Sequence, residues 1–128
     1  MFRSTVNKLA LLSTMICLMI LAAPSMYAQK APVANMLVRV QGTVVTINAN
    51  TSSYDRSCST ADYTIDAVNT RTGQSIAIHT GTLATLRDPG DGGIVVYDFA
   101  ANPGLYDITL TVTDCNGSGA QTLRILAR

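Results

Sequence analysis

The sequence predicts an all-β fold, an antiparallel sandwich of about seven to eight short strands. Its eight acidic residues are all aspartate, so glutamate, a residue that favours helices, is absent. Stretches of alternating apolar and polar residues recur along the chain with turn residues between them, and no stretch of helical length has 3.6-residue periodicity. Charged residues make up only 13% of the chain, and its length suits one domain.

Residues 1–28 are predicted to be a signal peptide that is removed from the mature protein. Arg3 and Lys8 give a positive start, an apolar run covers 9–23, and the small residue Ala28 stands where cleavage is expected. The run is about 15 residues long, whereas a membrane-spanning helix needs roughly 20. A retained membrane anchor is the alternative. The prediction places the mature protein in the periplasm or cell envelope, or secreted outside the cell, with transient membrane contact through the signal peptide.

Two cysteines, Cys58 and Cys115, remain when the signal peptide and its Cys17 are removed. An even pair in an exported chain predicts a disulfide bond, because export leads to an oxidising compartment. Two free thiols or part of a metal site are the alternatives. The chain offers too few ligands for a typical zinc site, because His79 is its single histidine.

The first half of the mature chain is expected to hold three strands. Residues 29–35 form a lead-in, because Pro32 lacks a backbone donor and favours extended chain, and the domain covers 36–128. The expected strands cover 37–40, 43–49 and 62–68. Alternation in the second and third turns one set of side chains toward the core: Val45, Ile47, Ala49, Tyr63, Ile65 and Ala67.

The second half is expected to hold the remaining strands and the strongest turn. An apolar stretch around Leu83 and Leu86 leads into the glycine-rich turn at 88–93. A phosphate-binding loop is the alternative there, but neither a Lys-Ser/Thr pair nor a helix start follows. The expected strands cover 74–79, 94–99, 105–113 and a last stretch around 123–125. Their clearest core-facing residues are Tyr106, Ile108, Leu110, Val112, Leu123 and Ile125.

Two motifs stand out in the mature chain. Gly-Asp-Gly at 90–92 is followed by the aromatic Phe99 and by the run PGLYDITLTVTDCNG at 103–117, and Ser-Tyr-Asp at 53–55 closes the turn after an alternating strand. With these motifs the chain resembles the PKD (polycystic kidney disease) family over most of its mature length. The resemblance implies an immunoglobulin-like β-sandwich.

The chain departs from the family pattern directly before Gly-Asp-Gly. Members of the family usually have Trp-x-Phe there, whereas this chain has Thr-Leu-Arg-Asp-Pro at 85–89 and no tryptophan. The core contact of that tryptophan is therefore expected to be rebuilt by Leu83, Leu86 and Tyr97. The strand order around 74–93 stays open.

The resemblance also assigns structural roles. It implies that the loops carrying Cys58 and Cys115 lie at the same end of the sandwich, so that a disulfide would staple two loops. Tyr106 stands at the start of its strand like the tyrosine of a tyrosine corner, with its hydroxyl bonded to nearby backbone. Gly104 and Gly117 fall at turn positions of the family motif.

The residues provide no catalytic set, and the chain is not expected to be an enzyme. His79 is predicted to lie on the strand face opposite Ile76 and Ile78, away from the core, as an ordinary surface histidine. Without a second histidine or a glutamate, a serine or cysteine nucleophile lacks a convincing base.

Calcium is the one cofactor for which candidate ligands exist. Asp55, Asp62, Asp114 and Asn116 fall in loops that the fold brings to one end, and their oxygen atoms suit Ca²⁺. The resemblance allows this, since some PKD-like domains bind calcium near their termini and loops. The alternative is that these side chains cap their own turns, which is the usual role of aspartate there.

Composition and charge argue against some classes of binding partner. The predicted mature chain has seven basic side chains against eight acidic ones, so it lacks the basic surface that nucleic acid or an anionic membrane requires. The sequence favours an exported, non-enzymatic interaction or structural module with a protein partner or self-assembly. A carbohydrate-binding protein is the alternative, although Tyr54 is the only mature tyrosine not expected in the core.

Overall fold

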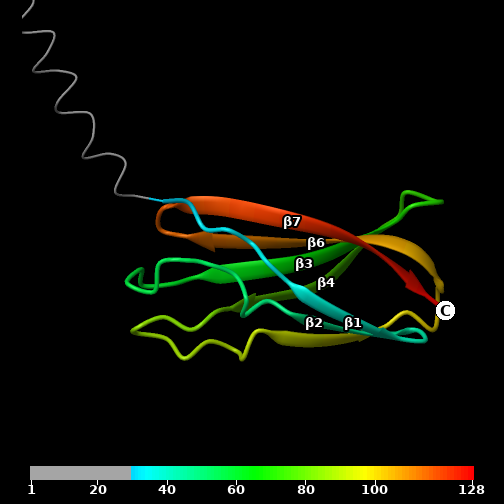
Figure 1. Ribbon diagram of the computed structural model, residues 1–128, viewed down its shortest axis with the longest axis horizontal. Helices are drawn as coiled ribbons and strands as arrows, with labels where there is room; N and C mark the ends of the chain where they lie inside the picture. The colour runs from blue at the N-terminus through cyan, green and yellow to red at the C-terminus, as the bar shows by residue number, and fades with distance from the viewer. Residues whose placement is uncertain (1–29) are drawn as a thin grey trace, which may run out of the picture. The chain divides into compact units, whose positions relative to one another are not determined.

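The computed structural model describes residues 30–128, which form seven β-strands and no helix (Figure 1). In chain order the strands are β1 (Leu37–Gln41), β2 (Val44–Asn48), β3 (Asp62–Asn69), β4 (Ser75–Thr82), β5 (Ile94–Asp98), β6 (Gly104–Asp114) and β7 (Gly117–Ala127). The predicted signal peptide and its Cys17 lie outside the described residues. Within residues 30–128, no helix is long and apolar enough to cross a membrane.

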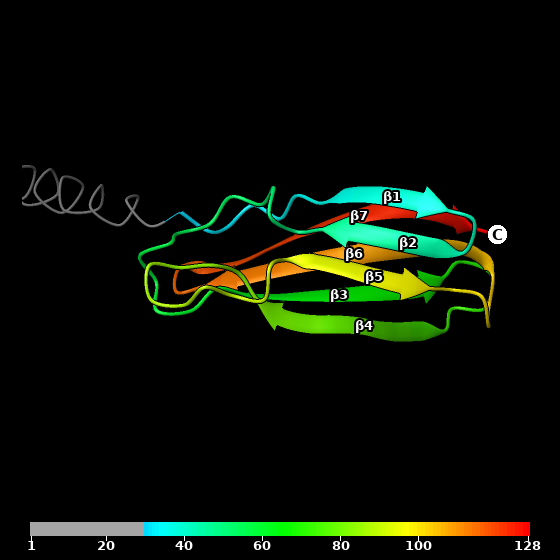
Figure 2. The same cartoon turned by 90° about the horizontal axis from the view of Figure 1, so that it is seen from below.

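The strands form two antiparallel sheets that pack face to face (Figure 2). One sheet has three strands in the order β1-β2-β5, and the other has four in the order β4-β3-β6-β7. The predicted all-β, immunoglobulin-like sandwich is therefore confirmed. The order that the sequence left open around 74–93 is also settled, because β4 pairs with β3 at the edge of the larger sheet and the following loop leads to β5 in the other.

The core lies between the sheets and is built mainly by alternate residues of β2, β3 and β6. The strands hold their register because a slip of one residue would turn each apolar set toward solvent. Every core-facing residue predicted in these strands, together with Ala49 just after β2, is buried: Val45, Ile47, Ala49, Tyr63, Ile65, Ala67, Tyr106, Ile108, Leu110 and Val112. In β7, Ile125 is buried and Leu123 packs half-buried against the core.

Three aromatic rings and Leu83 pack in or against the core. The Phe99 ring lies between Tyr106 and Tyr97, with centroid distances of 4.4 Å and 4.7 Å. Leu83 is 1% exposed, as predicted, but Leu86 is 79% exposed. The prediction for Leu86 was wrong because it lies in irregular chain between β4 and β5, where alternation does not apply.

A β-bulge changes the direction of side chains in β4. Ile65 of β3 faces His79, but the next residue of β3, Asp66, faces Ala77, so Ile78 is extra. Facing residues of neighbouring strands lie on the same side of a sheet, and Ile65 points into the core. His79 therefore projects from the inner face of the sheet, and the prediction that it faces away from the core was wrong.

Turn residues of the family motif occupy the ends of β6 and β7. The buried Tyr106 donates a hydrogen bond from its hydroxyl to the carbonyl oxygen of Asn102, as in a tyrosine corner. Gly104 and Gly117 have φ values of 156° and 137°, which residues with a Cβ atom rarely adopt. These contacts match the structural roles that the resemblance implied.

Candidate functional site

A disulfide bond joins Cys58, in the loop between β2 and β3, to Cys115, in the turn between β6 and β7. The S–S distance is 2.02 Å and the Cα–Cα distance is 5.6 Å. The predicted disulfide and its position between two loops at one end of the sandwich are confirmed. A carboxylate oxygen of Asp55 lies within 4.8 Å of both sulfur atoms, but sulfur atoms bonded to each other are not thiolates and do not offer a metal site.

Three of the four predicted calcium ligands lie together beside this disulfide. Asp114 accepts hydrogen bonds from the backbone N–H of Asp55 at 3.0 Å and of Asn116 at 2.8 Å. Asn116 in turn donates from Nδ2 to Asp55 at 3.1 Å. Asp62 is exposed at the start of β3, and no hydrogen bond of the described residues joins its side chain to the other three. These contacts connect two loops, while calcium binding stays a prediction.

The carboxyl group of Asp55 is held in its ionised form by these neighbours. The hydroxyl and backbone N–H of Ser57 and the side-chain amide of Asn116 lower the pKa of Asp55. The geometry is that of an aspartate capping its own turn, which was the alternative to calcium in the sequence.

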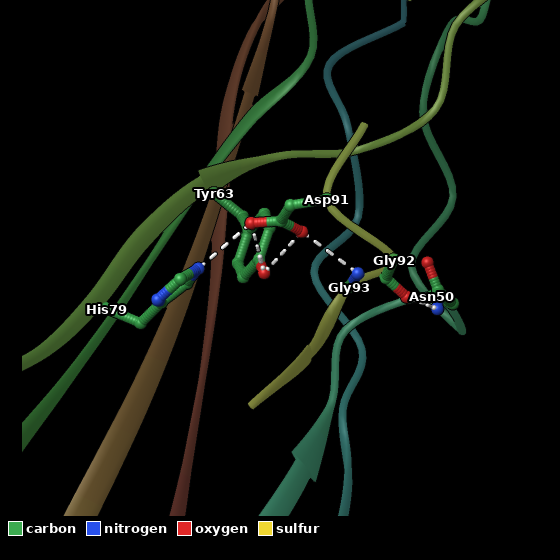
Figure 3. Close-up of polar contacts among 6 residues, drawn as sticks. All are labelled: Asn50, Tyr63, His79, Asp91, Gly92 and Gly93. Atoms are coloured by element: carbon green, nitrogen blue, oxygen red, sulfur yellow. Dashed lines mark hydrogen bonds and ion pairs between the residues drawn. The ribbon is translucent and has the colours of Figure 1, made fainter. Parts of the chain in front are cut away.

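A second polar cluster connects the loop before β5 to the larger sheet (Figure 3). The hydroxyl of Tyr63 donates to both carboxylate oxygens of Asp91, at 2.8 Å and 3.0 Å. His79 Nε2 lies 2.9 Å from Oδ2 of Asp91, and the backbone N–H of Gly93 donates to Oδ1 at 3.0 Å. One aspartate thus joins β3, β4 and its own loop. We refer to Tyr63, His79 and Asp91 as the Asp91 cluster.

Close approach between chain segments explains a glycine within β4. A Cβ atom at Gly81 would overlap the Oδ2 atom of Asp91 and lie 2.7 Å from Nε2 of His79. Glycine inside a strand is a known sign that another part of the chain comes near. This was the one sequence signal for the Asp91 cluster, which the sequence analysis missed.

The same loop is also attached to the smaller sheet. The backbone N–H of Ala49 donates to the carbonyl of Gly93 at 2.8 Å, and the Asn50 side chain donates to the carbonyl of Gly92 (Figure 3). The backbone N–H of Asp91 donates to the carbonyl of Thr82 at 2.9 Å. The glycine-rich turn predicted at 88–93 therefore bridges both sheets at the point where β5 begins.

The contacts of the Asp91 cluster are those of a structural clamp between strands and loop. Burial, followed by the hydrogen bond and the charge of Asp91, raises the pKa of the Tyr63 hydroxyl, so that this group resists ionisation. Among the described residues, no serine, threonine or cysteine side chain hydrogen-bonds to His79. A base and an activated nucleophile are thus not brought together here.

Acid is expected to destabilise the domain through its aspartates. Burial raises the pKa of Asp91, but the hydrogen bonds from His79, Gly93 and Tyr63 outweigh it and leave the pKa lowered. A lowered folded-state pKa gives stabilisation that is complete above the unfolded pKa of about 4 and is lost as the pH falls through the folded value. Urea unfolding between about pH 2 and pH 6 should show the free energy of unfolding falling below about pH 4.

An Asp91→Asn variant is the control for this pH dependence. It should be less stable at neutral pH and show a shallower loss on acidification. Asp55 and Asp107 also have lowered pKa values, from Ser57 and Arg124 respectively, and they keep the remaining slope. If the free energy of unfolding depends on pH as steeply in Asp91→Asn as in the native protein, the role assigned to Asp91 is contradicted.

β5 leaves one row of backbone groups without a partner at the edge of the smaller sheet. The flanking bonds from Ala49 N to Gly93 O and from Phe99 N to Thr43 O, both 2.8 Å, set the alternation of the β2–β5 ladder. Residues 95 and 97 accordingly bond to β2, while residues 94, 96 and 98 direct their N–H and C=O groups away from it. Side chains on this edge are also apolar, since Ile94 is 58% and Val96 is 64% exposed.

The other sheet edges in the described part of the chain are each interrupted, covered or charged. In β4, the bulge at Ile78 breaks the row, and the carbonyl of Thr82 accepts from Asp91. β1 carries the exposed Arg39 and contacts β7.

The edge of β7 is covered by residues 31–36. The backbone N–H of Met36 donates to the side chain of Gln121 at 2.8 Å, and a Cβ atom at Gly119 would overlap the carbonyl oxygen of Pro32. Val33 is held in turn by an isolated bridge to Ser53. Within residues 30–128, β5 is therefore the edge strand that has no bulge, no covering segment and no basic side chain.

Comparison with known proteins supports the fold described above. No protein-family model matches the chain, and no curated protein matches it. Among solved structures, the PKD1 domain of Vibrio anguillarum Epp is similar with a TM-score of 0.52 and 24% identity, over 78% of this chain and 96% of that domain. The PKD1 domain of the Vibrio cholerae metalloprotease PrtV is similar with a TM-score of 0.51 and 28% identity, over 77% and 98%. The chain thus has the immunoglobulin-like β-sandwich fold of these PKD domains.

Proposed function

We propose that the protein is an exported, non-enzymatic interaction module that acts at the cell envelope or outside the cell through protein–protein contacts. The observation that carries the proposal is the open edge of β5. Unpaired N–H and C=O groups next to exposed Ile94 and Val96 are the surface to which another strand can add. Strand addition takes its affinity from the backbone and needs no pocket.

The disulfide supports export. The Cys58–Cys115 bond is typical of proteins that fold in oxidising compartments. It agrees with the signal peptide predicted at 1–28.

The non-enzymatic part of the proposal is supported by the Asp91 cluster. Its histidine and tyrosine both direct their polar atoms at one carboxylate, which leaves no free pair of base and nucleophile. These residues hold the loop at 88–93 and thereby fix the start of β5.

The carbohydrate-binding alternative gains no support from the tyrosines. Sugar-binding surfaces of this kind need an exposed flat ring, whereas the four tyrosines in residues 30–128 are buried or half-buried. Tyr54, the one not expected in the core, donates its hydroxyl to the carbonyl of Ala84 at 2.7 Å. We expect a glycan screen to be negative.

Export and interaction are tested on protein purified from the exporting cell. The intact, non-reduced protein should have the mass of a chain that begins at Gln29, less the two hydrogen atoms lost when the disulfide forms. A photo-crosslinking residue at Val96 should form protein adducts in that cell, and the same residue at Thr122 on β7 is the control. Retention of 1–28 with free thiols would contradict export, and equal adducts at both positions would contradict an interaction through β5.

A further inference from the structure

We propose that β5 pairs with β5 of a second copy of this chain, antiparallel about a two-fold axis at Val96. The two three-stranded sheets would then join into one continuous sheet. This inference rests on the proposed function and names both its surface and its partner. Four steps lead to it: the backbone row, the side chains, the charge and the rigidity of the edge.

The free backbone row of β5 is complementary to itself. Its outward groups belong to Ile94, Val96 and Asp98, which are spaced evenly about Val96. A two-fold axis there places Val96 opposite Val96 of the other copy and Ile94 opposite Asp98. All three positions are then of the type that exchanges both N–H···O bonds, so each outward donor and acceptor of the strand gains a partner.

The side chains of the paired strands are compatible on both faces. On the outer face, Val96 lies beside its own copy, and β-branched neighbours of this kind stabilise a strand pair. On the inner face, Val95 lies opposite Tyr97. If one strand were shifted by two residues in one direction, one hydrogen-bonded residue pair would be lost. A shift in the other direction would bring Asp98 closer to Asp98 of the other copy. The symmetric register is therefore favoured.

Charge does not oppose the pairing. Asp98 is the single charged residue of β5, and in the symmetric register the two copies of it stand at opposite ends. Four residues of extended chain separate them by roughly 13 Å, beyond the screening length at physiological salt. The predicted mature chain is close to neutral, with seven basic and eight acidic side chains, so the copies repel each other little.

The edge is also rigid before it binds. The Asp91 cluster fixes the loop at 88–93, and the Ala49–Gly93 hydrogen bond aligns the first residue of β5. A preformed strand loses little conformational entropy on pairing. Since one pair of five-residue strands buries less surface than the roughly 1,200 Å² of a standard interface, we expect a weak, reversible dimer.

The first experiment measures molar mass by sedimentation of the exported protein between about 10 μM and about 1 mM, the range in which weak complexes dissociate. The native chain should shift from monomer to dimer. Val96→Lys should weaken the association at least about tenfold, because two ammonium groups would meet at the axis and edge lysines oppose strand pairing. Leu37→Lys, on the outer face of β1 where Leu37 is 59% exposed, is the matched control and should dimerise like the native chain. Circular dichroism melting verifies that both variants fold.

The second experiment tests the register. In the proposed pair, Val96 faces its own copy in a hydrogen-bonded position with a Cα–Cα distance of about 5.5 Å, which a disulfide can span. Val96→Cys should therefore give a covalent dimer under oxidising conditions, and Leu37→Cys, on the outer face of β1, should give little.

The outcomes separate the two proposals. A native chain that stays monomeric to about 1 mM, or equal cross-linking at 96 and 37, overturns pairing with a second copy. If photo-crosslinking at Val96 still yields adducts to a different protein, the interaction module stands and only its partner was wrong. If adducts at Val96 match those at the control position as well, the proposed function fails too.

Discussion

Replacing Cys58 and Cys115 together by serine should lower the free energy of unfolding by about 4 kcal/mol, because the bond closes a loop with a sequence separation of 57. This is a large part of the roughly 5–15 kcal/mol that stabilises an ordinary domain. For a domain of this size, the melting temperature should fall by roughly 15 °C or more. Thermal unfolding of the native and double-serine proteins, followed by circular dichroism, measures the change.

Reduction of the native protein is the matched control and should give the same melting temperature as the double variant. The two loops have a second connection, through hydrogen bonds of Asp114 and Asn116 to Asp55. A loss below about 1 kcal/mol would mean that these hydrogen bonds, and not the disulfide, hold the loops together.

Gly81→Ala should destabilise the domain by about 2 to 3 kcal/mol. The added Cβ overlaps Oδ2 of Asp91, so the carboxylate must leave its position. The hydroxyl of Tyr63, a residue that is 1% exposed, then loses a charged acceptor, and the loop at 88–93 loses its anchor on the larger sheet. Urea unfolding measures the change in free energy.

A double-mutant cycle shows whether the effect of Gly81→Ala passes through Asp91. Asp91→Ala should cost a similar amount by itself, since it removes the same hydrogen bonds. In the Asp91→Ala background the clash is gone, and Gly81→Ala should be close to neutral. If the two losses simply add, then the clash at Gly81 acts on something other than the Asp91 carboxylate.

The sequence predicted the layers of the sandwich well because β3 and β6 have long alternating patterns. One face of β6 is buried from Tyr106 to Val112, and a pattern of this length has one consistent orientation. The disulfide could also be predicted, since the sequence contains a predicted signal peptide followed by an even cysteine pair.

The sequence failed where a contact is non-local. His79 was assigned to the outer face because alternation assumes a regular strand, and the bulge at Ile78 has no clear local signal. Leu86 was assigned to the core on hydrophobicity alone, although single exposed leucines are common. The open edge of β5 depends on the strand order of the sheet, which is a property of the whole fold.

Both ends of the domain are needed to complete it. The segment that covers β7 lies near the beginning of the described chain, and its bond from Met36 to Gln121 spans 85 residues. Contacts between such distant parts form late, because a long loop must close before they contribute. If the chain is exported one end at a time, as the predicted signal peptide implies, this edge can close only after nearly all of the domain has emerged. A truncation that removes residues 31–36 would thus leave β7 open as a second site for unwanted strand pairing.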